Sequence, residues 1–299
     1  MIGLNLSRKH IFIAALSLLL IAAGLAPASA QEVAAAPYAS PLSEAVANNL
    51  RVIYNVGQAY GNRGGVFSKV GDSITVNINF MHPFGWGVYD LAIYSYLQPV
   101  IDHFNWTITD ADGGASFTHE SLAAGVGWAA WGVLEPELAD LEAGCLAGEK
   151  PLECEYRIMR PAFALIMLGT NDVSYRTPAD VRYDLERILR LSLEWGVIPI
   201  FSTIPMRPEW STNVYAINAE IADMTADWNL PLWDYAGAMN SLPDYGLARD
   251  EVHPSSPPSY RPQEAAIFTP DYLQYGYVMR NLTGLQMLDT VWRAADPGA

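Results

Sequence analysis

The sequence predicts an α/β three-layer sandwich, in which helices cover both faces of a central parallel sheet. Short apolar runs alternate along the chain with longer segments of helical spacing, which is the pattern of a parallel sheet with crossover helices. Hydrophobic residues make up 51% of the 299 residues, enough for a large core. Charged residues reach only 16%, below the ~25% typical of soluble domains, so an intrinsically disordered chain is not expected.

The first thirty residues have the pattern of an export signal. Arg8 and Lys9 precede the apolar run Ile11 to Leu20, and Ala28-Ser29-Ala30 supplies the small residues that a signal peptidase needs. Cleavage is expected after Ala30, which would place the mature protein outside the cytoplasm, secreted or periplasmic. The alternative is a retained anchor, but the apolar run is shorter than the ~20 residues that a membrane span needs.

We therefore divide the chain into a signal peptide (1–30), an N-terminal leader and helix (31–60) and one main domain (61–299). Neither an internal repeat nor a long linker interrupts the last of these. Within the second part, Gln31 to Pro41 is expected to be a loose leader. Ser43 is predicted to cap a helix whose apolar residues share one face: Val46, Leu50, Ile53 and Val56.

Strands and helices are predicted to alternate in the main domain. The expected strands are Val66–Val70, Ala162–Leu168, Val197–Ser202 and Leu230–Trp233, and the expected helices are Tyr89–Phe104, Pro178–Trp195, Thr212–Trp228 and Tyr277–Trp292. Thr177 should cap the second helix, with Pro178 in its first position. Since ligands bind beyond the carboxyl ends of parallel strands, the chemistry should lie there.

The charge balance excludes several kinds of partner. The formal charge is 17 − 32 = −15, or 15 − 32 = −17 once Arg8 and Lys9 are removed with the signal peptide. No cluster of Lys and Arg is present to contact phosphates, so a nucleic-acid partner is not expected. Binding to an anionic membrane surface is disfavoured too, and no stable membrane insertion is expected after signal cleavage. The sequence leaves the oligomeric state open.

The two cysteines are expected to form a disulfide. Cys145 and Cys154 close a short loop, and an exported protein meets an oxidising compartment. Two free thiols are the alternative. A structural zinc site is not expected, because no adjacent His completes a ligand set.

Three polar motifs follow predicted strands or close the predicted site. The first is Gly71-Asp72-Ser73-Ile74-Thr75, in which a serine follows a Gly turn and is a candidate nucleophile, although a helix cap is an alternative. The second is Met167 to Asp172, where the Asn171 amide either donates into the crevice or forms an Asx turn. In the third, Asp250 and His253 can pair on one turn, leaving the histidine Nε2 free as a base.

Together these motifs resemble the SGNH (GDSL-type) hydrolase family, from about Gly65 to the terminal helix. The matching segments are Gly71 to Ile74, with Ile for the usual Leu, Gly169 to Asp172 and Asp250 to His253. The resemblance implies a flavodoxin-like fold and the following roles: Ser73 as nucleophile, His253 as general base, Asp250 as its orienting partner and Asn171 as an oxyanion donor. The family's second block is matched less clearly: the backbone N–H of Gly127 is our choice for a further oxyanion donor beside that of Ser73, and Gly125 is the fallback.

The resulting prediction is an exported serine hydrolase that cleaves carboxylic esters through an acyl-enzyme, without a metal or organic cofactor. Expected substrates are small-molecule or polysaccharide esters, such as O-acetylated carbohydrates or short-chain lipid esters. Two alternatives stay open. An acyltransferase would use the same residues to acylate an alcohol, and a catalytically silent carbohydrate-binding protein would use exposed Trp and Tyr to stack on sugars.

Other motifs in the sequence do not predict a function. Gly125-x-Gly127-x-x-Ala130 fits a loose dinucleotide fingerprint but does not follow the first strand of the domain. His82, His103 and His119 lack metal-ligand spacing, so no metal site is predicted. The aromatic residues after Ser73 are equally compatible with helix packing and with a substrate platform: Phe80, Phe84, Trp86, Tyr89, Tyr94 and Tyr96.

Overall fold

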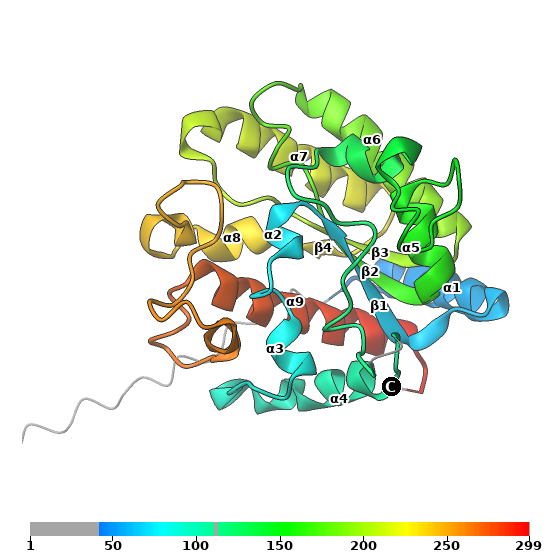
Figure 1. The fold of residues 1–299 in the computed structure, drawn as a ribbon, viewed down its shortest axis with the longest axis horizontal. Coiled ribbons are helices and arrows are strands. Elements are labelled where there is room, and N and C mark those ends of the chain that lie inside the picture. Colours follow the sequence, from blue (N-terminus) through cyan, green and yellow to red (C-terminus); the bar gives the residue numbers. More distant parts are fainter. Residues whose placement is uncertain (1–41, 111–112, 299) are drawn as a thin grey trace, which may run out of the picture. The chain divides into compact units, whose positions relative to one another are not determined.

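The computed structural model describes residues 42–110 and 113–298, and these contain one parallel sheet. Its strands follow in chain order: β1 (Arg63–Gly71), β2 (Pro161–Met167), β3 (Ile198–Ser202) and β4 (Leu232–Trp233). All neighbouring strands run parallel, so each connection crosses over the sheet through a helix. The predicted parallel α/β architecture is confirmed (Figure 1).

A fifth segment lies at the outer side of β1. Gly71 pairs with Met167 of β2 and also forms a parallel bridge with Ala124. Because the two partners of a strand residue lie on opposite sides, Ala124 occupies the edge position beside β1. Counting this segment, the strand order is that of flavodoxin-like sheets, which switch direction at the first strand and bind ligands there. The carboxyl end of β1 is therefore the expected place for a site.

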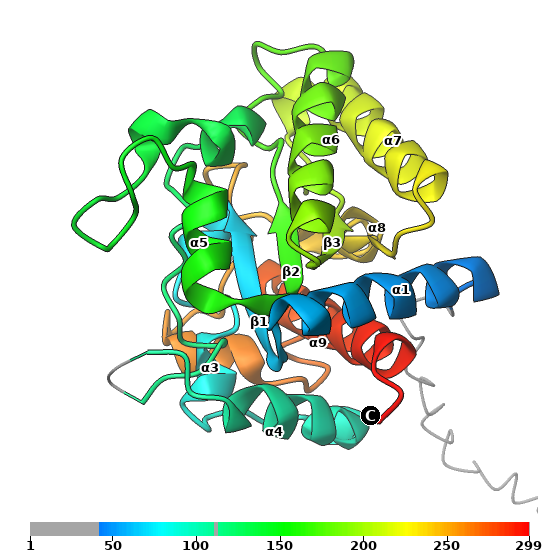
Figure 2. The same ribbon diagram turned by 90° about the vertical axis from the view of Figure 1, so that its right-hand side faces the viewer.

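Helices cover both faces of this sheet. The helices α5 (Pro151–Met159), α6 (Pro178–Glu194) and α7 (Ser211–Asp227) lie on one face, and α4 (Gln98–Trp106) and α9 (Gly276–Ala295) lie on the other (Figures 1 and 2). α1 (Glu44–Tyr60) packs against α9. The three predicted layers are thus confirmed.

Short helices occupy several connections between these elements. The α-helical ones are α2 (Ser73–Val76), α3 (His82–Gly85) and α8 (Tyr235–Met239). The 3₁₀ turns are Ala92–Leu97, Ala130–Leu134, Pro136–Leu138, Pro208–Trp210, Pro243–Gly246 and Pro262–Ala266. α2 follows β1 directly, so it begins at the switch point of the sheet.

Two helix starts agree with the sequence. The Ser43 hydroxyl accepts a hydrogen bond from the Val46 N–H at 3.2 Å, and the Thr177 hydroxyl accepts one from Asp180 at 3.2 Å. Pro178 occupies the first turn of α6, where its missing N–H costs no hydrogen bond.

The predicted face of α1 is only partly correct. Leu50 and Ile53 are buried as expected, but Val56 is 39% exposed and Gly57 is buried instead. A Cβ at Gly57 would lie 2.1 Å from the Gly196 carbonyl oxygen, so the helix approaches that turn closely through its glycine. This backbone contact rotates the helix away from the face that the apolar spacing predicted.

The predicted helix Tyr89–Phe104 is wrong in its first half. Asp90 instead forms a parallel bridge with Ile267, a 3₁₀ turn follows, and the α-helix α4 begins only at Gln98. Pro99 stands in the first turn of α4 and would break a helix that continued through it. Of the aromatic residues after Ser73, Phe80, Phe84 and Tyr94 are core, whereas Trp86 and Tyr96 are 40% and 49% exposed.

In the part of the chain that the structure describes, no helix is both long and apolar enough to cross a membrane. The predicted signal peptide (1–30) and the leader Gln31 to Pro41 lie outside the described residues, so both stay predictions.

Candidate active site

The serine of the first motif stands at the start of α2, where β1 ends. Asp72 caps this helix, because its Oδ1 accepts a hydrogen bond from the Ile74 N–H at 2.9 Å. A Cβ at Gly71 would lie 2.2 Å from the Thr75 Oγ1 and 2.7 Å from the Met167 carbonyl oxygen, so only glycine fits there. The turn therefore holds Ser73 at the carboxyl edge of the sheet, and the cap belongs to Asp72 rather than to the serine.

A residue that was not predicted to belong to the site holds α2 in place from the C-terminal helix α9. Arg280 of α9 is 1% exposed, and its guanidinium donates to the Ile74 carbonyl oxygen and to the Thr75 Oγ1, the latter at 2.9 Å. The guanidinium also lies over the Phe80 ring, 3.8 Å from its centroid. The sequence shows this arginine among other polar residues of the terminal helix, such as Asn281 and Gln286, and its partner Ile74 is 206 residues away, so no local pattern reports the contact.

Ser73, His253 and Asp250 form one hydrogen-bonded chain. The Ser73 Oγ lies 2.9 Å from the His253 Nε2, and the His253 Nδ1 lies 2.7 Å from the Asp250 Oδ2. Because a carboxylate only accepts, the Nδ1 carries the proton and the Nε2 presents its lone pair to the serine hydroxyl. The structure thus brings the serine of the first motif to the Asp250–His253 pair of the third.

Asp250 also accepts two backbone hydrogen bonds through its other oxygen. The N–H groups of Val252 and His253 both lie 3.0 Å from its Oδ1. Partial burial by itself would raise the pKa of Asp250, but the bond to the His253 ring and these two backbone bonds outweigh it and lower the pKa. The carboxylate therefore stays ionised and keeps the imidazole in the tautomer that a base needs.

A closed turn fixes the position of the histidine. Leu247 and Pro254 form an antiparallel bridge, and the Ala248 N–H donates to the His253 carbonyl oxygen at 2.8 Å. Glu251, at the tip, has a left-handed backbone (φ 56°), which is a strained conformation for a residue with a side chain. The motif Asp-x-x-His thus spans a tight loop rather than a helix.

The expected oxyanion donors differ in the contacts that they make. The Asn171 Nδ2 donates to the Trp128 carbonyl oxygen at 2.9 Å and lies 3.5 Å from the Asp72 Oδ2. The side chain therefore reaches across the edge of the sheet and does not form the Asx turn that was the alternative. Among the described residues, the backbone N–H of Ser73 and that of Gly127 have no acceptor.

The two candidate glycines differ in how their N–H groups are used. Gly125 donates to the Gly71 carbonyl oxygen at 3.1 Å, so its N–H is already engaged beside β1. Gly127 has a positive φ of 78° and open space where a Cβ would stand. Its turn is closed by the Trp128 N–H donating to the Gly125 carbonyl oxygen. This geometry favours Gly127 over the fallback Gly125.

Two buried carboxylates lie behind the site. Asp72 is fully buried, and burial raises its pKa to about 6, although the bond from Ile74 and the charges of Arg280 and His253 act in the opposite direction. Asp172 is buried too, and burial raises its pKa although Ala130 and Arg176 donate hydrogen bonds to it.

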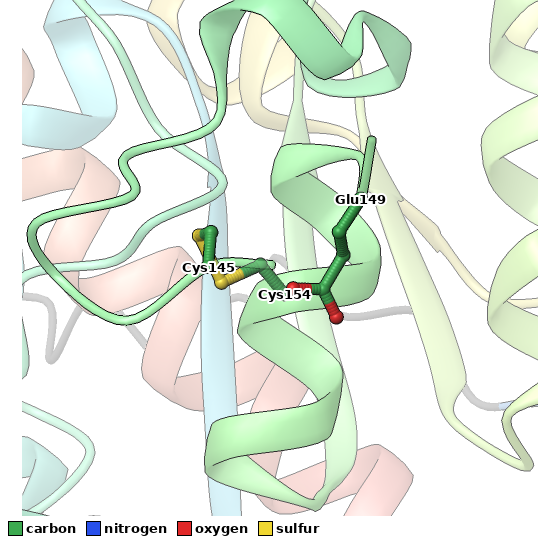
Figure 3. A group of neighbouring side chains, drawn as sticks. All are labelled: Cys145, Glu149 and Cys154. Carbon is green, nitrogen blue, oxygen red and sulfur yellow. A yellow bond between two sulfur atoms is a disulfide. The ribbon is translucent and has the colours of Figure 1, made fainter. Parts of the chain in front are cut away.

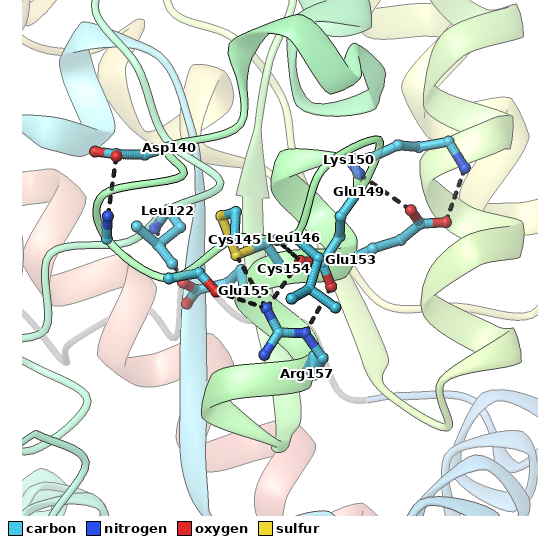
Figure 4. The surroundings of a disulfide bond; sticks show 12 residues. Leu122, Asp140, Cys145, Leu146, Glu149, Lys150, Glu153, Cys154, Glu155 and Arg157 are labelled. Atoms are coloured by element: carbon cyan, nitrogen blue, oxygen red, sulfur yellow. Dashed lines mark hydrogen bonds and ion pairs between the residues drawn. A yellow bond between two sulfur atoms is a disulfide. The ribbon is translucent and has the colours of Figure 1, made fainter.

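The predicted disulfide is present. Cys145 and Cys154 are joined, with their Cα atoms 5.2 Å apart, and Figure 4 shows how they tie the preceding loop to α5, which carries Cys154. Glu149 lies beside the two sulfurs (Figure 3). This is the one group of potential metal ligands that the described residues form. Because the sulfurs are oxidised and the Arg157 guanidinium binds both oxygens of Glu149 at 2.7 and 2.8 Å, the group does not suit a metal ion.

The other three histidines of the described residues make structural contacts. The His82 Nδ1 donates to the Phe80 carbonyl oxygen, the His103 Nε2 donates to the Gly64 carbonyl oxygen, and the His119 Nε2 contacts the buried carboxylate of Glu155 at 3.1 Å.

Fold and site together define a class: an α/β sandwich of flavodoxin-like order with a Ser-His-Asp chain at the carboxyl edge of its sheet. Among solved structures, the chain is similar to a carbohydrate esterase family 3 protein from Talaromyces cellulolyticus, with 16% identity, a TM-score of 0.47 and coverage of 75% of this chain and 98% of that one. It is also similar to the lipase/acylhydrolase from Enterococcus faecalis, with 21% identity, a TM-score of 0.42 and coverage of 73% and 95%.

A third similar structure is Axe2, an acetylxylan esterase from Geobacillus stearothermophilus, with 14% identity, a TM-score of 0.45 and coverage of 74% and 93%. The structural neighbours are thus lipolytic proteins of the G-D-S-L family and carbohydrate esterases, over about three quarters of the chain. No family model matches the sequence, and no curated protein matches it.

Proposed function

We propose that this protein is a serine esterase that hydrolyses carboxylic esters through an acyl-enzyme formed on Ser73. One observation carries the proposal. The chain of hydrogen bonds from Asp250 through His253 to Ser73, at 2.7 and 2.9 Å, has the geometry of a nucleophile, a base and the group that orients the base.

The reaction follows from these contacts. The Ser73 Oγ attacks the ester carbonyl carbon while its proton moves to the His253 Nε2, and the carbonyl oxygen takes up the negative charge. The N–H groups of Ser73 and Gly127 and the Asn171 amide are the proposed donors to that oxygen. The histidine then protonates the leaving alcohol. A water molecule, deprotonated by the same Nε2, attacks the acyl-enzyme and releases the carboxylic acid and the free serine.

Asp250 acts without giving up its charge. Its low pKa keeps it ionised, so it stabilises the imidazolium that forms during each proton transfer. No step calls for a metal or an organic cofactor, since a base, a nucleophile and anion donors suffice for ester hydrolysis.

The proposed substrate is an uncharged ester, with an O-acetylated carbohydrate as the leading candidate. The formal charge of −15 supports a neutral substrate, because an anionic lipid would meet an unfavourable field. We also propose that the protein is exported, which the residue pattern of 1–30 and the joined cysteines support.

An organophosphonate serine probe tests the proposal. The probe should label Ser73 alone, and Ser73→Ala should abolish both labelling and turnover of short-chain esters. The exposed Ser95 offers a matched control, since Ser95→Ala should leave both unchanged. Labelling or turnover that survives Ser73→Ala would refute the proposal. Acyl transfer to an added sugar acceptor in place of hydrolysis would identify an acyltransferase, and a folded wild type inert to every ester would indicate a silent binding protein.

A further inference from the structure

The loop 125–130, which we call the oxyanion loop, has little packing at its tip. Val126 is 75% exposed, and open space lies where a Cβ at Gly127 would stand. The Gly127 N–H is one of the proposed donors to the oxyanion, and such a donor must be in place before the charge develops. Because the tip is not packed into the core, its position depends on the hydrogen bonds on either side of it.

Hydrogen bonds hold the oxyanion loop on both sides of this tip. Before the tip, the Gly125 N–H donates to the end of β1 at 3.1 Å. After the tip, the Trp128 carbonyl oxygen accepts from the Asn171 amide at 2.9 Å. Two residues further on, the Ala130 N–H donates to the Asp172 Oδ2 at 3.0 Å. The two side chains that bind the loop are adjacent in the chain and follow β2, so the end of β2 fixes the second half of the loop.

Asp172 is held so that one of its oxygens is committed to the oxyanion loop. Its side chain is fully buried, and its Oδ1 accepts from the Arg176 guanidinium at 3.0 Å while its Oδ2 accepts from Ala130. Ala130 is itself buried, so the loss of the carboxylate would leave a buried N–H without this acceptor. Arg176 would keep a partner, because its guanidinium also lies 2.6 Å from the Asp184 carboxylate.

We infer that Asp172 is a positioning residue for the oxyanion loop, and that through the Ala130 N–H it holds the Gly127 N–H where the oxyanion forms. A carboxylate only accepts hydrogen bonds, so Asp172 cannot itself donate to the oxyanion. Asn171 also binds the loop, but it is a proposed donor, so a substitution there would not separate positioning from donation. The inference rests on the proposed function, since the position of a donor matters only where an oxyanion forms.

Steady-state kinetics on a short-chain acetate ester test the inference. Asp172→Ala should lower kcat about 10²-fold, the loss expected when a catalytic group is misplaced by about 1 Å, and should change KM by less than about two-fold. Asp172→Asn should recover part of this loss, because its amide oxygen can still accept from Ala130, although Arg176 competes for it. The Ki of butylboronic acid should rise about 10-fold or more in Asp172→Ala, since its tetrahedral adduct with Ser73 places an oxygen among the same donors.

Asp184→Asn is the matched control. Asp184 is 3% exposed and shares Arg176 with Asp172, and within the described part of the chain its ion pairs go to Arg176 and Arg187. Its substitution can therefore cost stability but should leave kcat and Ki unchanged. Thermal melting of each variant identifies an assay temperature at which it is folded. If Asp172→Ala does not fold, Asp172→Asn replaces it, with a lower kcat and a higher Ki than Asp184→Asn as the expected result.

Three outcomes would overturn the inference: an unchanged kcat and Ki in the folded Asp172 variants, a rise in KM alone, or an equal loss of kcat in Asp184→Asn. Wild-type hydrolysis of the same ester is measured first and tests the proposed function separately. An inert wild type would contradict that function and, with it, the inference. An active wild type with an equally active Asp172→Ala would contradict the positioning role alone.

Discussion

Replacing the buried Asp72 by Asn is predicted to stabilise the protein at pH 8 but not at pH 4. Asp72 is fully buried, and burial raises its pKa from 3.8 to about 6. The bond from the Ile74 N–H and the charges of Arg280 and His253 offset only part of that effect. The carboxylate is therefore a charge that the folded protein holds at a cost, whereas an amide of nearly the same shape carries no charge.

The sign and size follow from proton linkage. The folded state keeps the Asp72 proton up to about pH 6, and the unfolded state releases it near pH 3.8. Between these values the folded state binds more protons, so the free energy of unfolding falls as the pH rises. The folded and unfolded pKa values of Asp72 differ by about 2 units, which lowers the free energy of unfolding by about 3 kcal/mol at any pH above 6. At 2–4 °C per kcal/mol for a domain of this size, Asp72→Asn should raise the Tm at pH 8 by roughly 6–12 °C.

Thermal melting of the wild type, Asp72→Asn and the control Asp223→Asn at pH 4 and pH 8 would measure the effect. Asp223 is exposed on α7, so its substitution should shift the Tm little at either pH. Asn is as good a helix N-cap as Asp and can accept the same bond from Ile74. Comparing the two pH values removes any contribution that does not depend on pH. An equal Tm shift at pH 4 and pH 8, or a loss of stability at pH 8, would refute the reasoning.

Three further predictions concern the site and its supports. Asn171→Ala should lower kcat by roughly 10² to 10³ with little change in KM; a lower Tm with near-normal kcat would instead mean that the amide only braces the Trp128 carbonyl. Alkylation without reductant should find no free thiol at Cys145 or Cys154, and the reduced protein should keep its circular dichroism spectrum, because so short a loop contributes at most about 3 kcal/mol. Arg280→Met should slow phosphonate labelling by about 10-fold or more, with partial recovery in Arg280→Lys, since two donors to the nucleophile helix are lost; an unchanged labelling rate would contradict this role.

The sequence could predict the parts of the fold and site that depend on local patterns. The strand β2 could be predicted from its unbroken apolar run, because a parallel strand that is buried on both faces is apolar along most of its length. Ser73 and Asn171 could be placed together because each follows such a strand, and the carboxyl ends of parallel strands share one edge. The partnership of His253 with Ser73, 180 residues apart, came from the family resemblance of the motifs and not from spacing.

What the sequence could not predict depends on contacts between distant segments. The face of α1 is set by the approach of Gly57 to Gly196, and no periodicity within one helix reports such a contact. The failed half of the helix Tyr89–Phe104 has one cause of this kind, since Asp90 pairs with Ile267 across the chain, and one that the sequence does show, since Pro99 stands in the first turn of α4. Local spacing predicts which elements form, whereas the packing of one element on another decides where each begins and which side it buries.

The buried charges around α2 are the clearest case of this difference. Lys69 before the turn, Asp72 within it and Arg280 from α9 are each at most 3% exposed. In the sequence, each stands beside another polar residue (Ser68, Ser73 and Asn281), and nothing shows that the three share a neighbourhood. In the fold, the charge of Arg280 lowers the pKa values of both Lys69 and Asp72. Substitutions at these three positions should therefore be non-additive in stability and in labelling rate, while pairs with Asp223 should be additive.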